Sequence, residues 1–406
     1  MDTPPYLIAR PDRPIWLIVS SGIVALAVAM GIGRFAFTPL MPLMLRDGTL
    51  SAADGAEWAA ANYIGYLLGA LTAARFSANP RRGLHLALFG VALVTLGAAW
   101  AGGGTHALLG AMLRGAAGIF SAWALVCTSS WGLAELARRQ APQLGARIYI
   151  GVGLGIMLVG MLAWLGGQQP AQWLWLEMGL LASAGAVFVK LNLQDEGAIV
   201  TVSPPSSSPP QSAKEGHLPL VVCYGIFGFG YIVPATFLPA MARQQVSDPL
   251  VFGLTWPLFG LAAALSVVAA ARYLSAWPRR RVWALAQGTM ALGTALPVAT
   301  QALWALAACA VLVGGTFMVA TMAGLQLARE RLPTNPTSLL ARMTVAFAVG
   351  QLLGPLLVRA LGPGNVAGWD ALVWTNAAAT VLLLFTAVWL WRDTGSSPST
   401  LTKKLR

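Results

Sequence analysis

Long apolar runs separated by short polar stretches dominate this chain. Residues 15–33 and 84–100, for example, contain no Asp, Glu, Lys or Arg. A helix that crosses a membrane needs about 20 mostly apolar residues, because in hydrocarbon a single segment satisfies its own backbone polar groups only as a helix. Twelve such helices are predicted, at residues 15–38, 58–76, 84–100, 106–131, 147–166, 172–190, 218–241, 249–271, 282–300, 302–324, 338–359 and 371–391.

The overall composition supports a protein that is embedded in a lipid bilayer. Of the 406 residues, 57% are hydrophobic and 10% are charged, whereas a soluble globular domain carries about 25% charged residues. A soluble fold of this size could not hide so much apolar surface, because a large part of any folded chain must face water. The sequence therefore predicts an all-α integral membrane protein.

The distribution of basic residues predicts the orientation. If the N-terminus is cytoplasmic, 21 of the 26 Lys and Arg residues fall on the cytoplasmic side. Arg46, Arg243 and Arg359 fall outside, and Arg34 and Arg114 lie within spans. This asymmetry follows the positive-inside rule for an even number of spans with both termini in the cytoplasm. The net charge of +12 is therefore interpreted as a topology signal and not as a nucleic-acid surface.

The chain divides into two similar parts. A stretch rich in Pro and Ser, typical of a linker, separates the sixth predicted span from the seventh. The predicted organisation is a cytoplasmic N-terminal tail, a six-helix half, a cytoplasmic linker, a second six-helix half and a cytoplasmic C-terminal tail, at residues 1–14, 15–190, 191–217, 218–391 and 392–406.

The two halves also repeat in sequence. Residues 31–46 align without gaps to residues 228–243, an offset of 197 positions. Because each half has six spans, the repeats share one orientation and are related by a pseudo-two-fold axis along the membrane normal. The identical pairs are Gly31/Gly228, Gly33/Gly230, Pro42/Pro239, Met44/Met241 and Arg46/Arg243.

Twelve spans arranged as six plus six parallel repeats resemble the major facilitator superfamily. Arg114 and Gly118 match the arginine-plus-glycine motif of the fourth helix in that superfamily. Residues 31–44 resemble the opening helix of its YbfB/YjiJ-type branch of bacterial proteins. Ala73 departs from the superfamily loop motif, which usually has an aspartate there. The resemblance implies a secondary transporter in the bacterial cytoplasmic (inner) membrane that works by alternating access.

Arg34 and Arg114 are the strongest candidates for a binding site. A charged side chain in hydrocarbon is costly, so it normally faces a cavity or a partner. No Asp or Glu is predicted at their depth. Since guanidinium binds carboxylate through two parallel hydrogen bonds, an organic anion is the predicted substrate. The alternative is that each arginine donates to backbone carbonyls that nearby Gly and Pro release.

Other residues are weaker candidates for the transport pathway. Tyr231 takes the repeat position of Arg34, and further candidates for substrate contact are Asn62, Tyr66, Trp123 and Trp256. Polar side chains within spans, such as Tyr63, Tyr224 and Gln351, belong to a wider set, most of which bond between helices for about 0.6 kcal/mol each. Candidate hinge residues are Gly31, Gly33, Pro39, Pro42, Gly118, Gly354 and Pro355. Close packing between helices would explain the glycines equally well.

The sequence thus predicts a monomeric transporter, active or facilitative, for a small-molecule substrate. Protons are an open choice of coupling ion, and no cofactor, metal or nucleic acid is expected. Alternatives are multidrug or amphiphile efflux by proton antiport and a non-transporting membrane sensor or partner subunit. A membrane enzyme is disfavoured because His85, His106 and His217 lie at a span end, in a loop and in the linker, where they form no catalytic or metal cluster.

Overall fold

The computed structural model describes residues 14–77, 79–102, 107–193, 217–246, 248, 252–300, 302–332, 337–362, 364 and 367–392. The predicted linker (191–217) and the two predicted tails (1–14 and 392–406) lie almost entirely outside these described residues. We refer to the helices before the linker as the N-terminal half and to those after it as the C-terminal half.

The N-terminal half consists of helices in the expected order. Its elements are α1 (Ile15–Leu26), the π-helix η1 (Ala27–Arg34), α2 (Phe37–Arg46), α3 (Ala52–Ser77), α4 (Pro80–Ala98), α5 (Ala107–Arg138), the short η3 (Pro142–Leu144) and α6 (Gly145–Ile148), α7 (Ile150–Leu165) and α8 (Ala171–Asn192). The C-terminal half continues with α9 (Leu218–Gln245), α11 (Thr255–Tyr273), α12 (Arg279–Ala299), α13 (Leu303–Arg331), α14 (Thr337–Leu361) and α15 (Ala371–Arg392).

The described helices are consistent with twelve membrane spans. Ten of them, counted within the described residues, are long and apolar enough to cross a bilayer. The other two, α3 and α4, have 26 and 19 residues and pack beside α5. At 1.5 Å per residue, 19 residues extend about 28 Å, which is close to the thickness of the hydrocarbon core.

Several helix boundaries differ from those that the sequence predicts. The first span is predicted to end at residue 38, but its helical path runs on to Arg46, because the sequence stays apolar up to that residue. The tenth is predicted to end at residue 324, and α13 extends to Arg331. The eighth is predicted from residue 249, whereas α11 begins at Thr255, after a turn at residues 253–254.

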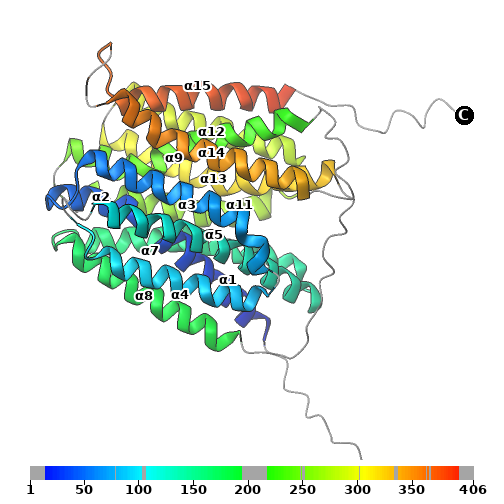
Figure 1. The fold of residues 1–406 in the computed structure, drawn as a ribbon. Helices are drawn as coiled ribbons and strands as arrows, with labels where there is room; N and C mark the ends of the chain where they lie inside the picture. Colours follow the sequence, from blue (N-terminus) through cyan, green and yellow to red (C-terminus); the bar gives the residue numbers. More distant parts are fainter. Residues whose placement is uncertain are drawn as a thin grey trace, which may run out of the picture.

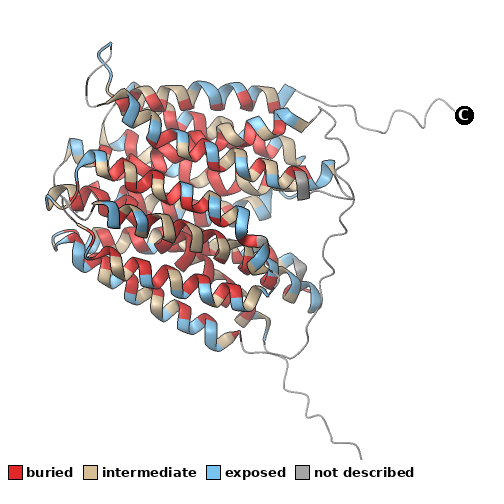
Figure 2. Ribbon diagram, in the orientation of Figure 1, coloured by how far each residue is buried: buried red, intermediate tan, exposed pale blue. Residues whose placement is uncertain are grey.

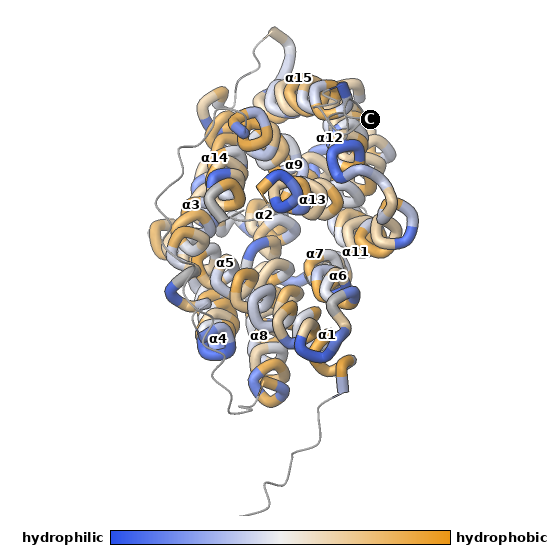
Figure 3. The backbone as a smooth tube through the Cα atoms, turned by 90° about the vertical axis from the view of Figure 1, so that its right-hand side faces the viewer, coloured by the Kyte–Doolittle hydropathy of each residue, from blue (hydrophilic) through white to orange (hydrophobic). Residues whose placement is uncertain are grey.

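The helices lie side by side and run between two ends of the bundle (Figure 1). The start of α1, the end of α8, the start of α9 and the end of α15 all lie at the right of Figure 1, and we call this the linker end. The opposite end, where α2 ends, is the far end. Viewed from the linker end, hydrophilic residues gather at the ends of the helices (Figure 3). This distribution suits helices whose ends reach the membrane surfaces.

The faces between the helices are buried and the outward faces are exposed (Figure 2), and many of the exposed side chains are large and apolar. Leu93, Leu108 and Phe385 are 71%, 72% and 69% exposed. A water-facing surface would not be expected to carry so many large apolar side chains, because exposed apolar patches drive association. Lipid chains are the solvent that fits this surface. The chain is a multi-pass membrane protein.

The two halves are in contact mainly where α3 meets α14, α7 meets α11 and α2 meets α9, and the short α6 also contacts α11. Thr38 donates to the carbonyl oxygen of Ala235 at 2.8 Å, and the hydroxyls of Tyr63 and Thr236 lie 2.7 Å apart. Thr38 and Ala235 are 197 positions apart, so they occupy the same place in the two repeats. The repeated segments therefore face each other between the halves.

The first span is interrupted near its middle. The π-helix η1 ends at Arg34, and a turn at residues 35–36 precedes α2. Pro39 has no N–H, so it cannot donate to Phe35 four residues earlier. The N–H of Thr38 bonds to the carbonyl of Phe35 instead, which removes the regular helical partner of the Arg34 carbonyl. The interruption thus releases backbone oxygens inside the bundle.

Gly31 lets the interrupted span pack directly against α7. A Cβ atom at Gly31 would lie 2.4 Å from the backbone carbon of Gly155. The backbone of Gly155 cannot move aside as a flexible side chain can. We therefore expect Gly31→Ala to destabilise the protein by about 1–3 kcal/mol or more. The expected result is a lower midpoint of thermal unfolding in detergent.

Gly288→Ala is the matched control for this prediction. Gly288 also lies in a transmembrane helix, but a methyl group added there would have the Cβ of Ala387 as its nearest neighbour, at 3.8 Å. Its unfolding midpoint should stay unchanged or rise slightly, because alanine favours helix. Equal midpoints for Gly31→Ala and Gly288→Ala would show that α7 can move away from the first span.

Candidate functional site

Arg34 lies near the middle of the bundle and is surrounded by aromatic and amide groups. Its side chain is buried, with 3% of the residue exposed. The guanidinium carbon lies 3.9 Å from the centroid of the Tyr66 ring. Nη2 donates to Oε1 of Gln351 and, at 3.5 Å, to the hydroxyl of Tyr231. Because Tyr231 and Gln351 belong to the C-terminal half, Arg34 connects the two halves.

Arg114 makes a different set of contacts. It donates from Nη1 to the carbonyl of Gly33 at 3.1 Å and from Nη2 to the carbonyl of Arg34 at 2.7 Å. These are the oxygens at the end of η1, where the helix is interrupted. Asn62 assists by donating to the carbonyl of Arg114 at 2.8 Å. Arg114 therefore holds the backbone that carries Arg34.

Neither guanidinium is neutralised by a carboxylate among the described residues, whose ion pairs lie at the ends of helices. The ion pair of Glu57 with Arg359 joins the start of α3, which follows the end of α2, to the end of α14, so it lies toward the far end. The Nε atoms of Arg34 and Arg114 are buried and have no hydrogen-bond partner among the described residues. Charged, buried donors without a counter-charge favour a bound anion, because the alternative is an uncompensated charge in a low dielectric.

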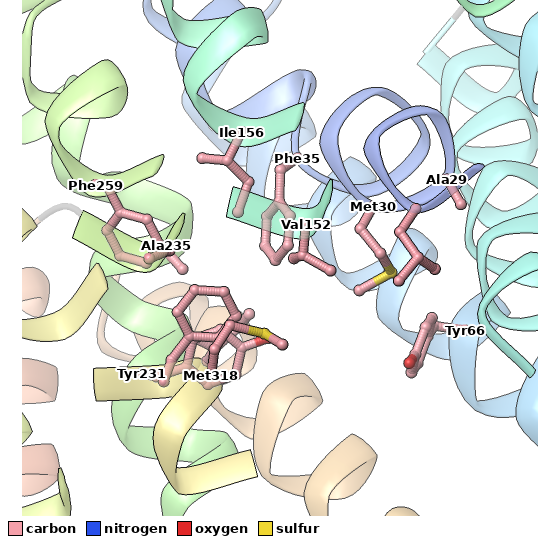
Figure 4. Packing of buried hydrophobic residues seen from close by; sticks show 14 of the residues in the cluster. Ala29, Met30, Phe35, Tyr66, Val152, Ile156, Tyr231, Ala235, Phe259 and Met318 are labelled. Carbon is pink, nitrogen blue, oxygen red and sulfur yellow. The ribbon is translucent and has the colours of Figure 1, made fainter. Parts of the chain in front are cut away.

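Aromatic rings surround Tyr231 on the C-terminal side of Arg34. The ring of Tyr231 stacks on those of Phe317 and Phe347 at centroid distances of 5.5 and 5.6 Å. Figure 4 shows Tyr231 and Met318 on one side, with Phe35, Met30 and Tyr66 of the N-terminal half across from them. The polar groups at Arg34 are thus set among large apolar side chains.

Of the other residues predicted for substrate contact, most lie close to Arg34. Tyr66 and Tyr231 contact its guanidinium. Asn62 is buried and donates to the backbone carbonyl of Arg114, so it is linked to Arg34 through Arg114. Trp256 is fully buried, and its ring centroid lies 6.0 Å from that of Phe35, the residue after Arg34.

Trp123 lies in a different place. Its ring stacks on Phe76 with centroids 3.8 Å apart, and its Nε1 donates to Thr72 at 2.9 Å. It is nine residues along α5 from Arg114, which corresponds to about 13 Å at 1.5 Å per residue. The structure thus places Trp123 nearer the linker end than Arg34 and its partners.

Among the predicted hinge residues, the four glycines sit at close helix contacts. Gly31 and Gly33 belong to η1, and Pro39 and Pro42 lie in α2. A Cβ at Gly118 would lie 2.1 Å from the carbonyl oxygen of Asn62, so this glycine allows α5 to approach α3. The last two predicted hinge residues lie in α14, where Gly354 faces the side chain of Ile232 and is followed by Pro355.

Gln351 is the main site residue that the sequence does not distinguish from the other polar side chains within spans. It is 0% exposed and bonds to both Arg34 and Tyr231. The sequence does not single out Phe317 and Phe347 at all. A glutamine in an apolar span is a detectable signal, but its partner lies 317 positions away, and no local pattern reveals such pairing.

The described residues contain no group of three or more His, Cys, Asp or Glu that could hold a metal ion. The polar groups gathered at Arg34 are two arginines, three tyrosines and two amides, with the hydroxyl of Thr236 nearby. Such a set can bind and orient an anion but includes no carboxylate or imidazole to move a proton within the described part of the chain.

Residues 26–390 match the family described as "Uncharacterised MFS-type transporter YbfB". This match covers most of the chain and agrees with the two-half helical bundle. The chain belongs to the YbfB-type family of major facilitator transporters. No curated protein matches the sequence. As a member of this family, the protein is a transmembrane transporter, which is not normally an enzyme.

Solved structures of other transporters share this family fold. A nucleoside transporter, NupG, aligns with a TM-score of 0.69 at 13% identity, covering 93% of this chain and 99% of its own. A mutant form of NupG aligns with a TM-score of 0.72 at 12% identity, covering 92% and 99%. A D-xylose-proton symporter aligns with a TM-score of 0.70 at 15% identity, covering 93% and 97%. At these identities the likeness concerns the fold alone.

Proposed function

We propose that this transporter carries a small organic anion across the bacterial cytoplasmic membrane, with Arg34 as the anion-binding group. The observation that supports the proposal is the buried guanidinium of Arg34, which has no carboxylate partner among the described residues and whose Nε has no acceptor. A carboxylate would supply the missing charge and a bidentate acceptor.

Arg114 has a supporting role in this proposal. Its two terminal nitrogens are already used by the carbonyls of Gly33 and Arg34. It fixes the position of Arg34 and adds positive charge at the same depth, which strengthens the attraction for an anion. The substrate contacts Arg34 directly, and Tyr66 and Tyr231 flank it.

The arrangement of the halves supports alternating access. We assign the linker end to the cytoplasm, because the positive-inside rule places most basic residues there. The described polar contacts that join the halves lie at the depth of Arg34 or nearer the far end, and they include Thr38 with Ala235 and Glu57 with Arg359. The contacts nearer the far end must part for the site to open outward and re-form for it to open inward.

Proton antiport of amphiphilic drugs is the competing function. Proton coupling normally uses a titratable carboxylate within the spans, whereas the described Asp and Glu residues lie at or near helix ends. We therefore propose uniport or anion exchange. Collapsing the pH gradient with an ionophore should leave the exchange of anions unchanged, and strong dependence on that gradient would favour antiport.

A ligand screen with matched neutral analogues tests the proposed function. Purified protein is heated with benzoate, lactate and other monocarboxylates, each beside its primary amide. Carboxylates that bind should raise the unfolding midpoint, since a ligand at 100 times its Kd stabilises the folded state by about 2.7 kcal/mol. The amides should not. The same carboxylates should cross the membrane of proteoliposomes faster than that of protein-free vesicles, into which their neutral acid forms diffuse.

If neither group of compounds protects the protein or crosses the membrane, the anion proposal is wrong. Equal protection by carboxylates and amides would show that charge is not what the site recognises. Transport of amphiphilic cations without any effect of carboxylates would favour the efflux function.

A further inference from the structure

Gln351 occupies the position on Arg34 that a substrate oxyanion would take. Its Oε1 accepts a hydrogen bond from Nη2 of Arg34, and its Nε2 donates to the hydroxyl of Tyr231. The arginine fixes the orientation of the amide, because only the oxygen of the amide can accept from a guanidinium. Gln351 is thus a neutral acceptor in the C-terminal half for the charged donor of the N-terminal half.

We propose that Gln351 acts as an internal substitute ligand, which satisfies Arg34 when no anion is bound and lets the empty carrier change its orientation. This inference rests on the proposed anion-binding role of Arg34. Substrate and Gln351 compete for the same guanidinium, so a bound carboxylate displaces the amide and a departing one lets it return. Donation to Tyr231 keeps the amide next to the site in the meantime.

The physical reason lies in the closed state between the two open ones. In either open state, water can solvate the guanidinium. When the halves close over the site, water is excluded, and an unpaired charged donor then disfavours closure strongly. A bound carboxylate removes this obstacle for the loaded carrier. Since no described carboxylate pairs with Arg34, the amide of Gln351 removes it for the empty carrier.

The site also explains why a neutral group suits this role better than a carboxylate. A carboxylate binds guanidinium more strongly than an amide does, because it adds an opposite charge and a second parallel hydrogen bond. An amide is therefore displaced by a carboxylate substrate, whereas an acidic side chain at this position would hold Arg34 permanently. A carrier that only exchanges anions would need no substitute ligand, because it never changes its orientation while empty.

The test compares net flux with exchange for Gln351→Leu, with radiolabelled benzoate and lactate as probes and the rates in protein-free vesicles subtracted. Net flux into empty proteoliposomes requires the empty carrier to return, whereas exchange against the same internal anion does not. We expect net flux to fall about 10-fold or more, because one hydrogen bond to a charged donor is lost in the closed state. Exchange should continue, and the affinity for the anion should rise up to about 10-fold, because the competitor is gone.

Gln351→Glu provides a second, independent measurement. The new carboxylate should pair with Arg34, so anion affinity should fall at least about 100-fold and both transport modes should cease. Gln287→Leu is the matched control. Gln287 is also fully buried, but it donates to the carbonyl of Cys223 at 3.2 Å in the C-terminal half. Its net flux, exchange and affinity should stay within about twofold of the unchanged protein.

The outcomes separate this inference from the proposed function. If anion binding depends on Arg34 but Gln351→Leu keeps the original ratio of net flux to exchange, the substitute-ligand inference is wrong and the proposed function stands. If Gln351→Leu does not fold, retention of anion affinity in Gln351→Glu overturns the inference. If the unchanged protein neither binds nor transports either probe, the proposed function is wrong and the inference falls with it.

Discussion

Arg34→Gln is expected to lower carboxylate affinity at least about 100-fold, because truncating one partner of a buried charged pair typically removes about 2–5 kcal/mol of binding free energy. Glutamine keeps a polar side chain at the site but loses the charge and the planar fork that orients a carboxylate. Binding is measured by titration of the purified protein with the carboxylate that gives the largest thermal protection, and transport is measured in proteoliposomes.

Protein stability should respond differently from binding in this variant. Arg34→Gln loses the hydrogen bonds to Gln351 and Tyr231, but the new amide can donate to them and a buried charge is removed, so the unfolding midpoint of Arg34→Gln should fall less than that of Arg114→Met. Arg34→Lys should retain part of the affinity, because it keeps the charge as a single point. Unchanged binding and transport in Arg34→Gln would remove Arg34 from the substrate site.

Arg114→Met is expected to act on stability first. The variant removes two donors from the carbonyls of Gly33 and Arg34, and each buried oxygen left without a partner costs about 1–3 kcal/mol. We therefore expect the unfolding midpoint in detergent to fall by several degrees. Anion affinity should fall as well, because the backbone that positions Arg34 loses its support.

Arg46→Met is the control for this second prediction. Arg46 also donates to backbone carbonyls, those of Gly167 and Gln169. Its side chain is 28% exposed, so water can replace the lost donor, and the change in stability should be smaller. If Arg114→Met keeps its unfolding midpoint but no longer binds the anion, Arg114 contacts the substrate directly, which is one of the two roles that the sequence leaves open.

The contrast between the two arginines shows where prediction from the sequence reaches its limit. Both stand out because a charge within an apolar span needs a partner, and both are buried in the structure. The sequence leaves two interpretations open, an anion site or donation to carbonyls. The contacts of Arg114 match the second interpretation geometrically, while those of Arg34 leave it turned toward the opposite half.

The repeat is a good guide to one part of the site. The offset of 197 residues pairs Arg34 with Tyr231, and the structure brings these two side chains together at 3.5 Å. Residues related by a two-fold axis meet only where they lie near that axis, and the facing segments of the first and seventh spans do so. Trp123 is a candidate only as an aromatic residue within a span, and this criterion says nothing about distance from the axis.

By itself, the sequence determined that the chain crosses a membrane, with helices of about the right number and place, because the length of an apolar run and the spacing of charges are local properties. The tertiary structure alone decided which helix faces meet. It placed Gln351 against Arg34 across 317 positions and the Arg114 nitrogens on the carbonyls of the interrupted helix. These pairings depend on close approaches such as that of Gly31 to Gly155, which arise only when the whole bundle packs.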